Sequence, residues 1–444
     1  MKRYVYIIIA IVVIAIIAVV VIIFLKKGQG GSSFLGLGGL GEGGLPQVGT
    51  QGTNGGSGSQ GGANSGGSDD SGSQANGAGG GAGASQIVLG QGSPAQTFGI
   101  VATGTALDYF VDASNTITVI QSDGTVITIS GGATAVISST TFSNIISAAF
   151  SYDGKKLFIN AGDPADPQTS ILTVSSGVWT SAAQSMQSPQ WSPSDYRIAY
   201  LSTSANGRTS LATVNAAALT KASVTVFSLD ATDLSLQWVS NAQFILSDKP
   251  TADNNGSIWL LNSTAGILTP MVYETPGAES VWGAYAGTST MGLVFTDGNA
   301  NSYNPSLEIM SASGAAPRAL SFVTLPSKCL FASATTSVAA SSGGTSTATT
   351  AAPSSTTMSV PYLYCGIPKD QAGLASGQLP DGYNMMSSFT SDQIVSVNLE
   401  TGAESVLRDD ATPHVDATDL KVANGILFFI SRYDGQIYAL TLGQ

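Results

Sequence analysis

The chain has 444 residues and a formal net charge of −12, with one histidine and two cysteines. These counts exclude a zinc finger, an iron–sulfur cluster and any metal site built from several histidines. Residues 1–27 carry four basic side chains and no acidic one, so the rest of the chain carries −16 and lacks the basic clusters that bind nucleic acid.

Residues 1–27 are predicted to form a transmembrane signal-anchor. Tyr4 to Leu25 is an uncharged run made mostly of Ile and Val. As an α-helix it would span roughly 33 Å, enough for a hydrocarbon core of about 30 Å. A cleaved signal peptide is the alternative, but its apolar stretch would be shorter and would end in a small-residue cleavage site. The basic residues on the two sides nearly balance, and we expect a single-pass topology with the N-terminus in the cytoplasm.

Residues 28–85 are predicted to be a disordered Gly/Ser-rich linker. They hold 24 of the 53 glycines, no Lys or Arg, and three acidic residues. This composition cannot bury enough apolar surface to offset chain entropy. A flexible coil of this length has a root-mean-square span of about 40 Å. The segment is either a spacer that lifts a domain from the membrane or a tolerated insertion with no length requirement.

Residues 86–444 consist of short strands and turns. An apolar residue, two variable residues and a second apolar residue recur in copies that begin at Ile117, Ile171, Leu211, Ile258, Leu307, Ile394 and Ile437. The starting points lie 54, 40, 47, 49, 87 and 43 residues apart, and the longest interval contains a low-complexity Ser/Thr/Ala insert at about 334–359. Residues i and i+3 of a strand point to opposite faces, so these strands are predicted to be buried on both sides, as in blades stacked around a ring.

A second apolar strand precedes each copy, and a third precedes most of these. Three visible strands and a fourth every 40–54 residues are typical of an all-β propeller. We predict a seven-bladed β-propeller, with six or eight blades as alternatives. The last copy ends four residues before Gln444. We therefore expect Ile87–Leu89 or nearby residues to complete the last blade and close the ring.

Two hairpins of this region resemble a known family. Their sequences are Phe150-Ser-Tyr-Asp-Gly-Lys-Lys-Leu-Phe158 and Trp191-Ser-Pro-Ser-Asp-Tyr-Arg-Ile-Ala-Tyr200. They are similar to the FSPDGKKIAF hairpin of TolB-like and other WD-repeat-like bacterial propellers, although the second lacks the Gly of the turn. The resemblance implies the propeller fold and no active site, because such repeats serve many functions.

Cys329 and Cys365 are predicted to lie in neighbouring strands of the sixth repeat. Such strands are about 4.7–4.9 Å apart, and a disulfide needs Cα atoms about 4.4–6.8 Å apart. A disulfide would close a loop of about 37 residues, contribute roughly 4 kcal/mol in the chain-entropy model, and require an oxidising compartment. The alternative is two separate buried thiols. The insert at 334–359 is either O-glycosylated or simply disordered.

No catalytic constellation is evident. His414 is the only base available for a Ser-His-Asp triad, and the globular part has no G-x-S-x-G motif, so we expect His414 to be a loop residue. Paired carboxylates for glycoside hydrolysis would have to come from the acids of two segments, and turn capping explains these acids as well. The candidate acids are Asp163 and Asp166, and Asp409, Asp410, Asp416 and Asp419.

Two loops, Asp253–Asn255 and Asp297–Asn299, have oxygen chemistry that suits calcium but lack the spacing of a twelve-residue calcium loop. Turns at strand ends have the same composition, so we predict no metal and no cofactor. The chain has five tryptophans, Trp179, Trp191, Trp238, Trp259 and Trp282. Trp191, Trp238 and Trp259 are predicted to pack blade against blade rather than to stack on a ligand.

We therefore expect a non-enzymatic extracytoplasmic propeller that is tethered to the cell membrane through residues 4–25 and binds or scaffolds a protein or glycan partner. One alternative is an envelope enzyme that acts on a glycan through paired carboxylates. Another is a passive surface or adhesion component. Two carboxyl groups about 5–9.5 Å apart in a pocket would favour the enzyme. A channel lined by Ser, Ala and Thr would favour the binding module.

Overall fold

A computed structural model describes residues 97–442, apart from 250, 253, 286–288, 300–301, 339–355 and 375–378. The expected anchor, the linker, Ile87–Leu89 and the centre of the 334–359 insert lie outside the described residues. Within these residues, no helix combines the length and the apolar character that a membrane span requires.

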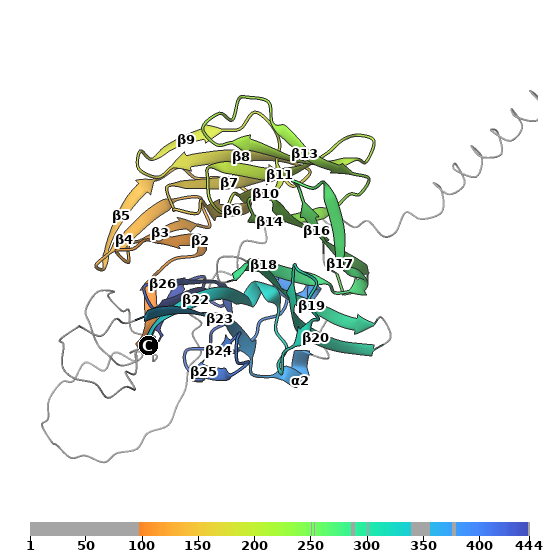
Figure 1. Ribbon diagram of the computed structural model, residues 1–444. Coiled ribbons are helices and arrows are strands. Elements are labelled where there is room, and N and C mark those ends of the chain that lie inside the picture. The colour runs from red at the N-terminus through yellow and green to blue at the C-terminus, as the bar shows by residue number, and fades with distance from the viewer. Residues whose placement is uncertain are drawn as a thin grey trace, which may run out of the picture. The chain divides into compact units, whose positions relative to one another are not determined.

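The described strands form seven four-stranded antiparallel sheets, which are the blades of a propeller (Figure 1). The first three blades are β2 (Ala106–Val111), β3 (Ile117–Gln121), β4 (Val126–Ser130) and β5 (Ala133–Ser138); β6 (Ile145–Phe150), β7 (Lys156–Asp163), β8 (Asp166–Thr173) and β9 (Val178–Ser181); and β10 (Gln187–Trp191), β11 (Arg197–Thr203), β12 (Thr209–Asn215) and β13 (Val224–Leu229).

The next three blades follow in chain order. They are β14 (Leu234–Ser240), β15 (Gln243–Asp248), β16 (Asn255–Asn262) and β17 (Ile267–Pro276); β18 (Glu279–Tyr285), β19 (Ser289–Asn299), β20 (Ser302–Ser311) and β21 (Arg318–Ala319); and β22 (Cys329–Val338), β23 (Thr356–Pro368), β24 (Asp392–Asn398) and β25 (Glu404–Arg408). The 3-10 helix η1 (Pro326–Lys328) precedes β22, and the short helices α2 (Gln371–Leu374) and α3 (Asp381–Asn384) lie between β23 and β24.

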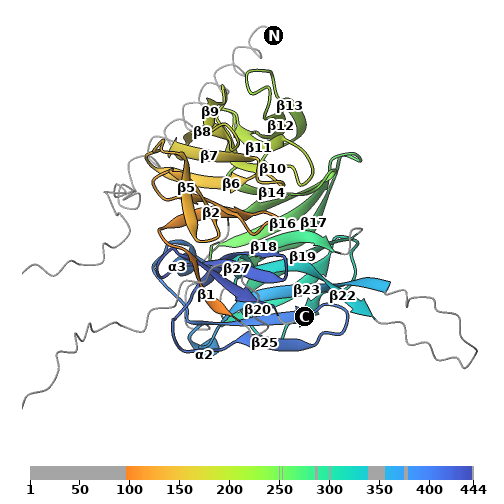
Figure 2. The ribbon, with the colours of Figure 1, turned by 90° about the vertical axis from the view of Figure 1, so that its left-hand side faces the viewer.

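The seventh blade closes the ring with strands from both ends of the described chain. It consists of β26 (Ala417–Ala423), β27 (Ile426–Ser431), β28 (Ile437–Thr441) and, as its outer strand, β1 (Phe98–Ala102). Phe98 of β1 pairs with Leu440 of β28, and Figure 2 shows β1 beside the strands of this blade. Closure by an N-terminal strand is therefore confirmed, with the strand at 98–102 rather than at 87–89.

The first strands of successive blades lie side by side and line the middle of the ring. β2 contacts β6, β6 contacts β10, and the series continues through β14, β18, β22 and β26. β26 returns to β2 through the hydroxyl of Tyr109, which donates a hydrogen bond of 2.8 Å to the carbonyl of Asp419. The seven-bladed propeller predicted from the repeat spacing is thus confirmed, whereas the assignment to WD-repeat-like propellers stays a prediction.

Burial on both faces of the third strands follows the predicted i and i+3 pattern. In β16, Leu261 packs in the apolar cluster shared with the third blade, whereas Ile258 packs in the cluster shared with the fifth. In β12, Val214 and Leu211 divide in the same way between the second and the fourth blades. Each third strand therefore ties its blade to both neighbours.

One repeat was placed in the wrong strand by the sequence pattern. The copy at Ile117 lies in β3, the second strand of the first blade, whereas the copies from Ile171 onward lie in third strands. The true third strand is β4, which begins at Val126 and has the same apolar spacing at Val126 and Ile129. Val126 lies 45 residues before Ile171, so the apparent interval of 54 residues comes from this misplacement.

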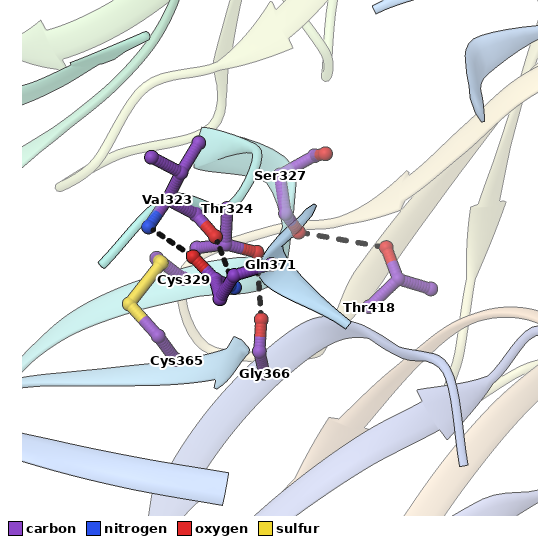
Figure 3. Close-up of a disulfide and its surroundings, with 8 residues drawn as sticks. All are labelled: Val323, Thr324, Ser327, Cys329, Cys365, Gly366, Gln371 and Thr418. Atoms are coloured by element: carbon purple, nitrogen blue, oxygen red, sulfur yellow. Dashed lines mark hydrogen bonds between the residues drawn. A yellow bond between two sulfur atoms is a disulfide. The ribbon is translucent and has the colours of Figure 1, made fainter. Parts of the chain in front are cut away.

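Cys329 and Cys365 form a disulfide between the first two strands of the sixth blade. They are direct partners in the β22–β23 register, and their Cα atoms are 4.2 Å apart. Around the disulfide, the side chain of Gln371 accepts a hydrogen bond from the Val323 amide and donates one to the Val323 carbonyl (Figure 3). The hydroxyl of Thr324 donates to the Gly366 carbonyl at 2.7 Å. These bonds attach the segment before β22 to the end of β23.

Candidate functional site

A pocket of about 260 Å³ lies where the first strands of the fourth and fifth blades meet. Six of its seven lining residues have polar side chains, although most of the surface that they expose in the pocket is apolar. The lining residues are Ser235, Gln237, Ser247, Glu279, Ser280, Val281 and Ser327. Glu279 supplies the only ionisable side chain among them, so the chemistry of the pocket depends on this carboxyl group.

Gln237 shapes the pocket because its amide completes the edge of β18. The Nε2 of Gln237 donates a hydrogen bond of 2.6 Å to the Ser280 carbonyl, and its Oε1 accepts one of 3.1 Å from the Trp282 amide. β18 is a first strand whose free edge would otherwise leave these backbone groups unpaired. The side chain of Gln237 therefore replaces a neighbouring strand and holds the fifth blade against the fourth.

Glu279 is the first residue of β18, and protein surrounds its carboxyl group while the side chain stays partly accessible. Burial raises the pKa of Glu279 above its ordinary value of 4.5, although hydrogen bonds with Asn384 and Ser327 oppose this effect. The Nδ2 of Asn384 lies 3.5 Å from Oε2 of Glu279. A carboxyl group that keeps its proton to a higher pH can act as a general acid.

Asp297 is a second carboxyl group on the same blade. In the β18–β19 register Glu279 pairs with Phe295, so Asp297 occupies the diagonal position, where neighbours are typically about 7–8 Å apart and somewhat closer between Cβ atoms. Asp297 is 3% exposed, and its Oδ2 accepts no hydrogen bond from any described residue. Burial and the neighbouring charge of Asp381 raise the pKa of Asp297 to about 6. At neutral pH it is therefore largely ionised.

Gly277 brings β18 close to Asp297. Its φ of +66° lies in the left-handed region, and a Cβ at this position would lie 2.8 Å from the Cβ of Asp297. Only glycine combines this backbone conformation with so close an approach. The turn before β18 thus places the Glu279 strand against the strand of Asp297.

The segment between β23 and β24 extends from the sixth blade over its neighbours. Oδ2 of Asp381, the first residue of α3, accepts a hydrogen bond of 2.9 Å from the Ala252 amide of the fourth blade. Asn384, at the other end of α3, contacts Glu279 of the fifth blade. Arg432 of the seventh blade donates to the Tyr383 carbonyl at 2.6 Å. One turn of helix therefore links three blades beside the pocket.

A buried ionic cluster fixes the other side of this segment. The Lys328 ammonium lies 2.8 Å from Asp392 and 2.7 Å from Asp416, and all three side chains are at most 1% exposed. Asp416 also accepts a hydrogen bond of 2.9 Å from the Tyr383 hydroxyl and pairs with Arg432 at 3.2 Å. Burial raises the pKa of Asp392 although the charge of Lys328 opposes this effect. Since every charge in this cluster is paired, we assign it a structural role.

A second ionic group lies where the first and seventh blades meet. The Lys421 ammonium pairs with Asp108 and lies 3.3 Å from Asp419. Burial is the main cause that raises the pKa of Asp419 to about 7, and Lys421 opposes it. Because Lys421 lies between the two carboxylates, these acids neutralise a cation instead of forming a catalytic pair.

The carboxylates proposed from the sequence are not brought together in one site. Asp163 and Asp166 face each other at the β7–β8 turn, where Asp163 caps the Ala165 amide. Asp409 pairs with Lys369 at 2.9 Å. The others are Asp410, which lies near Arg408, and Asp416 and Asp419, which belong to the two ionic groups described above.

Neither His414 nor the two loops considered for calcium form a recognisable site among the described residues. His414 is exposed, and its Nδ1 lies 3.1 Å from the Ser391 hydroxyl. Asp253 lies outside the described residues, and Asp297 belongs to the region of Glu279. Among the described residues, no three His, Cys, Asp or Glu side chains gather as metal ligands would.

The tryptophans pack against the preceding blade, and for Trp191, Trp238 and Trp259 this confirms the predicted packing of blade against blade. The indole of Trp179 donates to the Ser138 hydroxyl of the first blade at 2.8 Å, and that of Trp191 donates to the Ala149 carbonyl of the second blade at 2.7 Å. Trp238 and Trp259 pack in the cluster shared with the third blade, and Trp282 packs in the cluster shared with the fourth. Their main contribution is therefore to inter-blade packing.

No family model matches the chain, and no curated protein matches it in sequence. The fold does resemble solved structures. An oligogalacturonate lyase in complex with manganese is 10% identical, with a TM-score of 0.47 over 79% of this chain and 91% of that chain. A prolyl endopeptidase is 11% identical, with a TM-score of 0.45 over 78% of this chain. The tricorn protease is 9% identical, with a TM-score of 0.44 over 78% of this chain.

The chain spans about half the length of the prolyl endopeptidase (51%) and a third of the tricorn protease (34%). These likenesses concern the fold alone. The solved structures that resemble this fold include enzymes, so the expectation of a non-enzymatic protein is withdrawn. That expectation rested on the lack of a sequence motif, and the fold itself gives no reason to exclude catalysis.

Proposed function

We propose that this protein is an enzyme that acts on an uncharged glycan, with Glu279 as its general acid. The observation that carries the proposal is the Glu279 carboxyl, whose pKa is raised by burial in a pocket otherwise lined mainly by serine and glutamine side chains. The hydroxyls of Ser235 and Ser247 bond each other at 2.6 Å and the Gln237 amide is bound to β18, so a sugar would use the hydrogen-bonding capacity that these groups and Ser327 retain. The pocket therefore combines a proton donor with hydroxyl groups that a sugar can contact.

The chemistry requires a second carboxylate, and Asp297 is the residue that we assign to it. In hydrolysis with inversion, the protonated acid gives its proton to the glycosidic oxygen as the bond to the anomeric carbon breaks, while the second carboxylate takes a proton from the attacking water. Asp297 does not line the pocket; it lies diagonal to Glu279 in the β18–β19 register. Its buried Oδ2 has no hydrogen-bond partner among the described residues and would accept that proton from a water that enters beside it.

The charges of the pocket favour an uncharged substrate over an acidic one. Neither a lysine nor an arginine lines the pocket, and the acids Asp297 and Asp381 belong to the neighbouring segments β19 and α3. A sugar carboxylate bound here would meet like charges without a basic partner, which costs binding energy in a partly buried site. We therefore expect uncharged oligosaccharides to be preferred over uronic acid oligomers.

We also propose that the enzyme is tethered outside the cell by residues 4–25, with residues 28–85 as the spacer. The disulfide between Cys329 and Cys365 supports an oxidising compartment. Protease treatment of intact cells tests the location: a C-terminal epitope should be removed without lysis. Retention of the epitope until the cells are lysed would contradict the location and leave the catalytic proposal unaffected.

The catalytic proposal is tested with residues 78–444, which form a compact unit. The substrates are oligomers of N-acetylglucosamine, glucose and mannose, with oligogalacturonides as the acidic comparison, and new reducing ends are the readout. Glu279→Gln should lower kcat at least about 100-fold, the usual contribution of a general acid. Glu400→Gln, a change at an exposed glutamate of the β24–β25 turn, is the matched control. Unchanged activity of the Glu279 variant, or no turnover of any uncharged oligomer, would contradict the proposal.

A further inference from the structure

Four large apolar side chains are exposed together beside α3. The exposed fractions are 71% for Met385, 46% for Met386, 42% for Phe389 and 48% for Tyr433. Most other large exposed apolar side chains of the described residues lie on outer strands of blades, namely Val136, Val178, Val224, Ile267, Tyr273 and Val406. The exposure beside α3 therefore needs a separate explanation, since grouped apolar surface commonly marks a binding site.

The aromatic rings of this patch stack on each other and on the guanidinium of Arg432. The Phe389 and Tyr433 rings stack with centroids 5.5 Å apart and an interplanar angle of 23°. The guanidinium of Arg432 lies 5.0 Å from the Phe389 ring centroid and 3.5 Å from that of buried Tyr383. Four groups thus form a continuous stack from the buried Tyr383 to the exposed Tyr433.

Arg432 also orders the backbone that carries Phe389. Its guanidinium pairs with Asp416 and donates hydrogen bonds to the carbonyls of Tyr383 and Ser388. The Arg432 side chain is 7% exposed and that of Asp416 is fully buried, so this ion pair restricts the motion of Arg432. Exposed rings that are already ordered lose little conformational entropy when a ligand binds, which is the usual advantage of a preorganised site.

The patch is joined to the pocket by α3. Asn384, the last residue of α3, contacts Glu279, and Met385 and Met386 follow it directly. A chain molecule that left the pocket along α3 would meet this patch. The edge of the patch is polar, because the Ser387 and Ser388 side chains and the Tyr433 hydroxyl belong to the segments that carry the apolar side chains.

We propose that Phe389 and Tyr433 form a second sugar-binding subsite, which takes a further ring of the same uncharged glycan that enters the pocket. This inference rests on the proposed function. The apolar face of a sugar ring stacks on the aromatic rings, while its hydroxyl groups remain available to the polar edge. The consequence is a preference for long oligosaccharides, because a disaccharide fills the pocket without reaching the rings.

The test measures binding as a function of ligand length. Calorimetric titrations use residues 78–444 with the Glu279→Gln change, so that ligands are not consumed, and N-acetylglucosamine, glucose and mannose oligomers of two to six units. For the preferred sugar, the longer oligomers should bind more tightly than the dimer. Phe389→Ala and Tyr433→Ala should each lower affinity for the long oligomers about 3- to 10-fold, the range expected for one aromatic contact, and leave the dimer unaffected. Tyr273→Ala removes a ring that is more exposed, at 67%, from the outer strand β17 and is the control.

The outcomes separate this inference from the proposed function. Equal affinity for the dimer and the hexamer, or a gain with length that survives both ring variants, overturns the subsite and leaves the pocket as the glycan site. An absence of binding by every uncharged oligomer contradicts the proposed function and the subsite together. Far-ultraviolet circular dichroism and thermal unfolding establish that the variants remain folded.

Discussion

The hydroxyl of Tyr109 donates a hydrogen bond of 2.8 Å to the carbonyl of Asp419, which lies 310 residues later in the chain. The same junction is reinforced by Lys421, whose ammonium reaches both the Tyr109 carbonyl and the Asp108 carboxylate. The ring is therefore closed twice, at its outer edge by the β1–β28 pairing and at its inner edge by these polar contacts.

Tyr109→Phe should weaken the inner closure. The Tyr109 side chain is fully buried, so the change leaves the Asp419 carbonyl without this donor in a site that water reaches poorly. We expect a loss of about 1–3 kcal/mol in the free energy of unfolding, measured by urea denaturation. Tyr152→Phe, at a side chain that is 48% exposed, should have almost no effect. Equal stability of the Tyr109 variant and the wild type would show that the hydrogen bond contributes nothing to closure.

The Asp-Gly turn of the second blade packs tightly against the first blade. Gly154 has a φ of +70°, and a Cβ there would lie 2.1 Å from the Phe110 ring. Gly207 has a φ of +81°, but nothing lies within 4 Å of the corresponding position. Gly207→Ala should therefore cost only the left-handed backbone strain, about 1–2 kcal/mol. Gly154→Ala should cost roughly 1–3 kcal/mol more, because the Phe110 ring must move. Similar losses for both variants in urea unfolding would contradict this account.

The propeller could be predicted from the sequence because blades repeat and their third strands are buried on both sides. Ile258 and Leu261 illustrate the rule, since each packs on a different neighbouring blade. The first blade was harder to place, because both its second and third strands, at Ile117 and Val126, carry the same apolar spacing. Only the strand pairing distinguishes them. The closing strand β1 was likewise misplaced by about ten residues, although Gly90, Gly92 and Pro94 form a turn signal that separates Phe98–Ala102 from Ile87–Leu89.

The candidate site could not be predicted, because its residues come from separate blades. Glu279 belongs to no motif, and its raised pKa depends on burial that arises only when the fourth and fifth blades and η1 meet. Asp297 was noticed in the sequence only as a calcium candidate. Asn384 and Asp381 reach this region from an insertion in the sixth blade. The one sequence feature that could have indicated this site was the position of Glu279 at the start of a first strand, because first strands line the middle of the propeller.

Acid should weaken the contact between the second and third blades. Burial acts to raise the pKa of Asp153, but hydrogen bonds from Tyr196, Lys155 and Ser151 outweigh it and hold the pKa at about 2. A carboxyl group whose pKa is lower in the folded protein than in the unfolded chain stabilises the fold at any pH above its unfolded-state pKa. This stabilisation is lost as the pH falls through its folded-state pKa. Tyr196→Phe removes a 2.6 Å hydrogen bond to Asp153. The stability of the wild type should therefore fall more steeply than that of the variant between about pH 4 and pH 2 in urea unfolding. Parallel pH profiles would exclude this contact as the cause.

Asp297→Asn should stabilise the protein at neutral pH and abolish catalysis. Burial and the charge of Asp381 raise the pKa of Asp297 to about 6. A carboxyl group whose pKa is raised in the folded protein contributes its full stability at a pH below its unfolded-state pKa, near 4. This contribution is lost as the pH rises through its folded-state pKa, about 6. The amide stays neutral throughout, so the variant should gain stability over the wild type at pH 7–8 and little at pH 4. Its activity should fall at least about 100-fold at pH 7 if Asp297 accepts the proton of water. Thermal unfolding at the two pH values checks the first expectation and the reducing-end assay the second. A stabilised variant with unchanged activity would support the cost of the buried Asp297 charge and would contradict a catalytic role for Asp297.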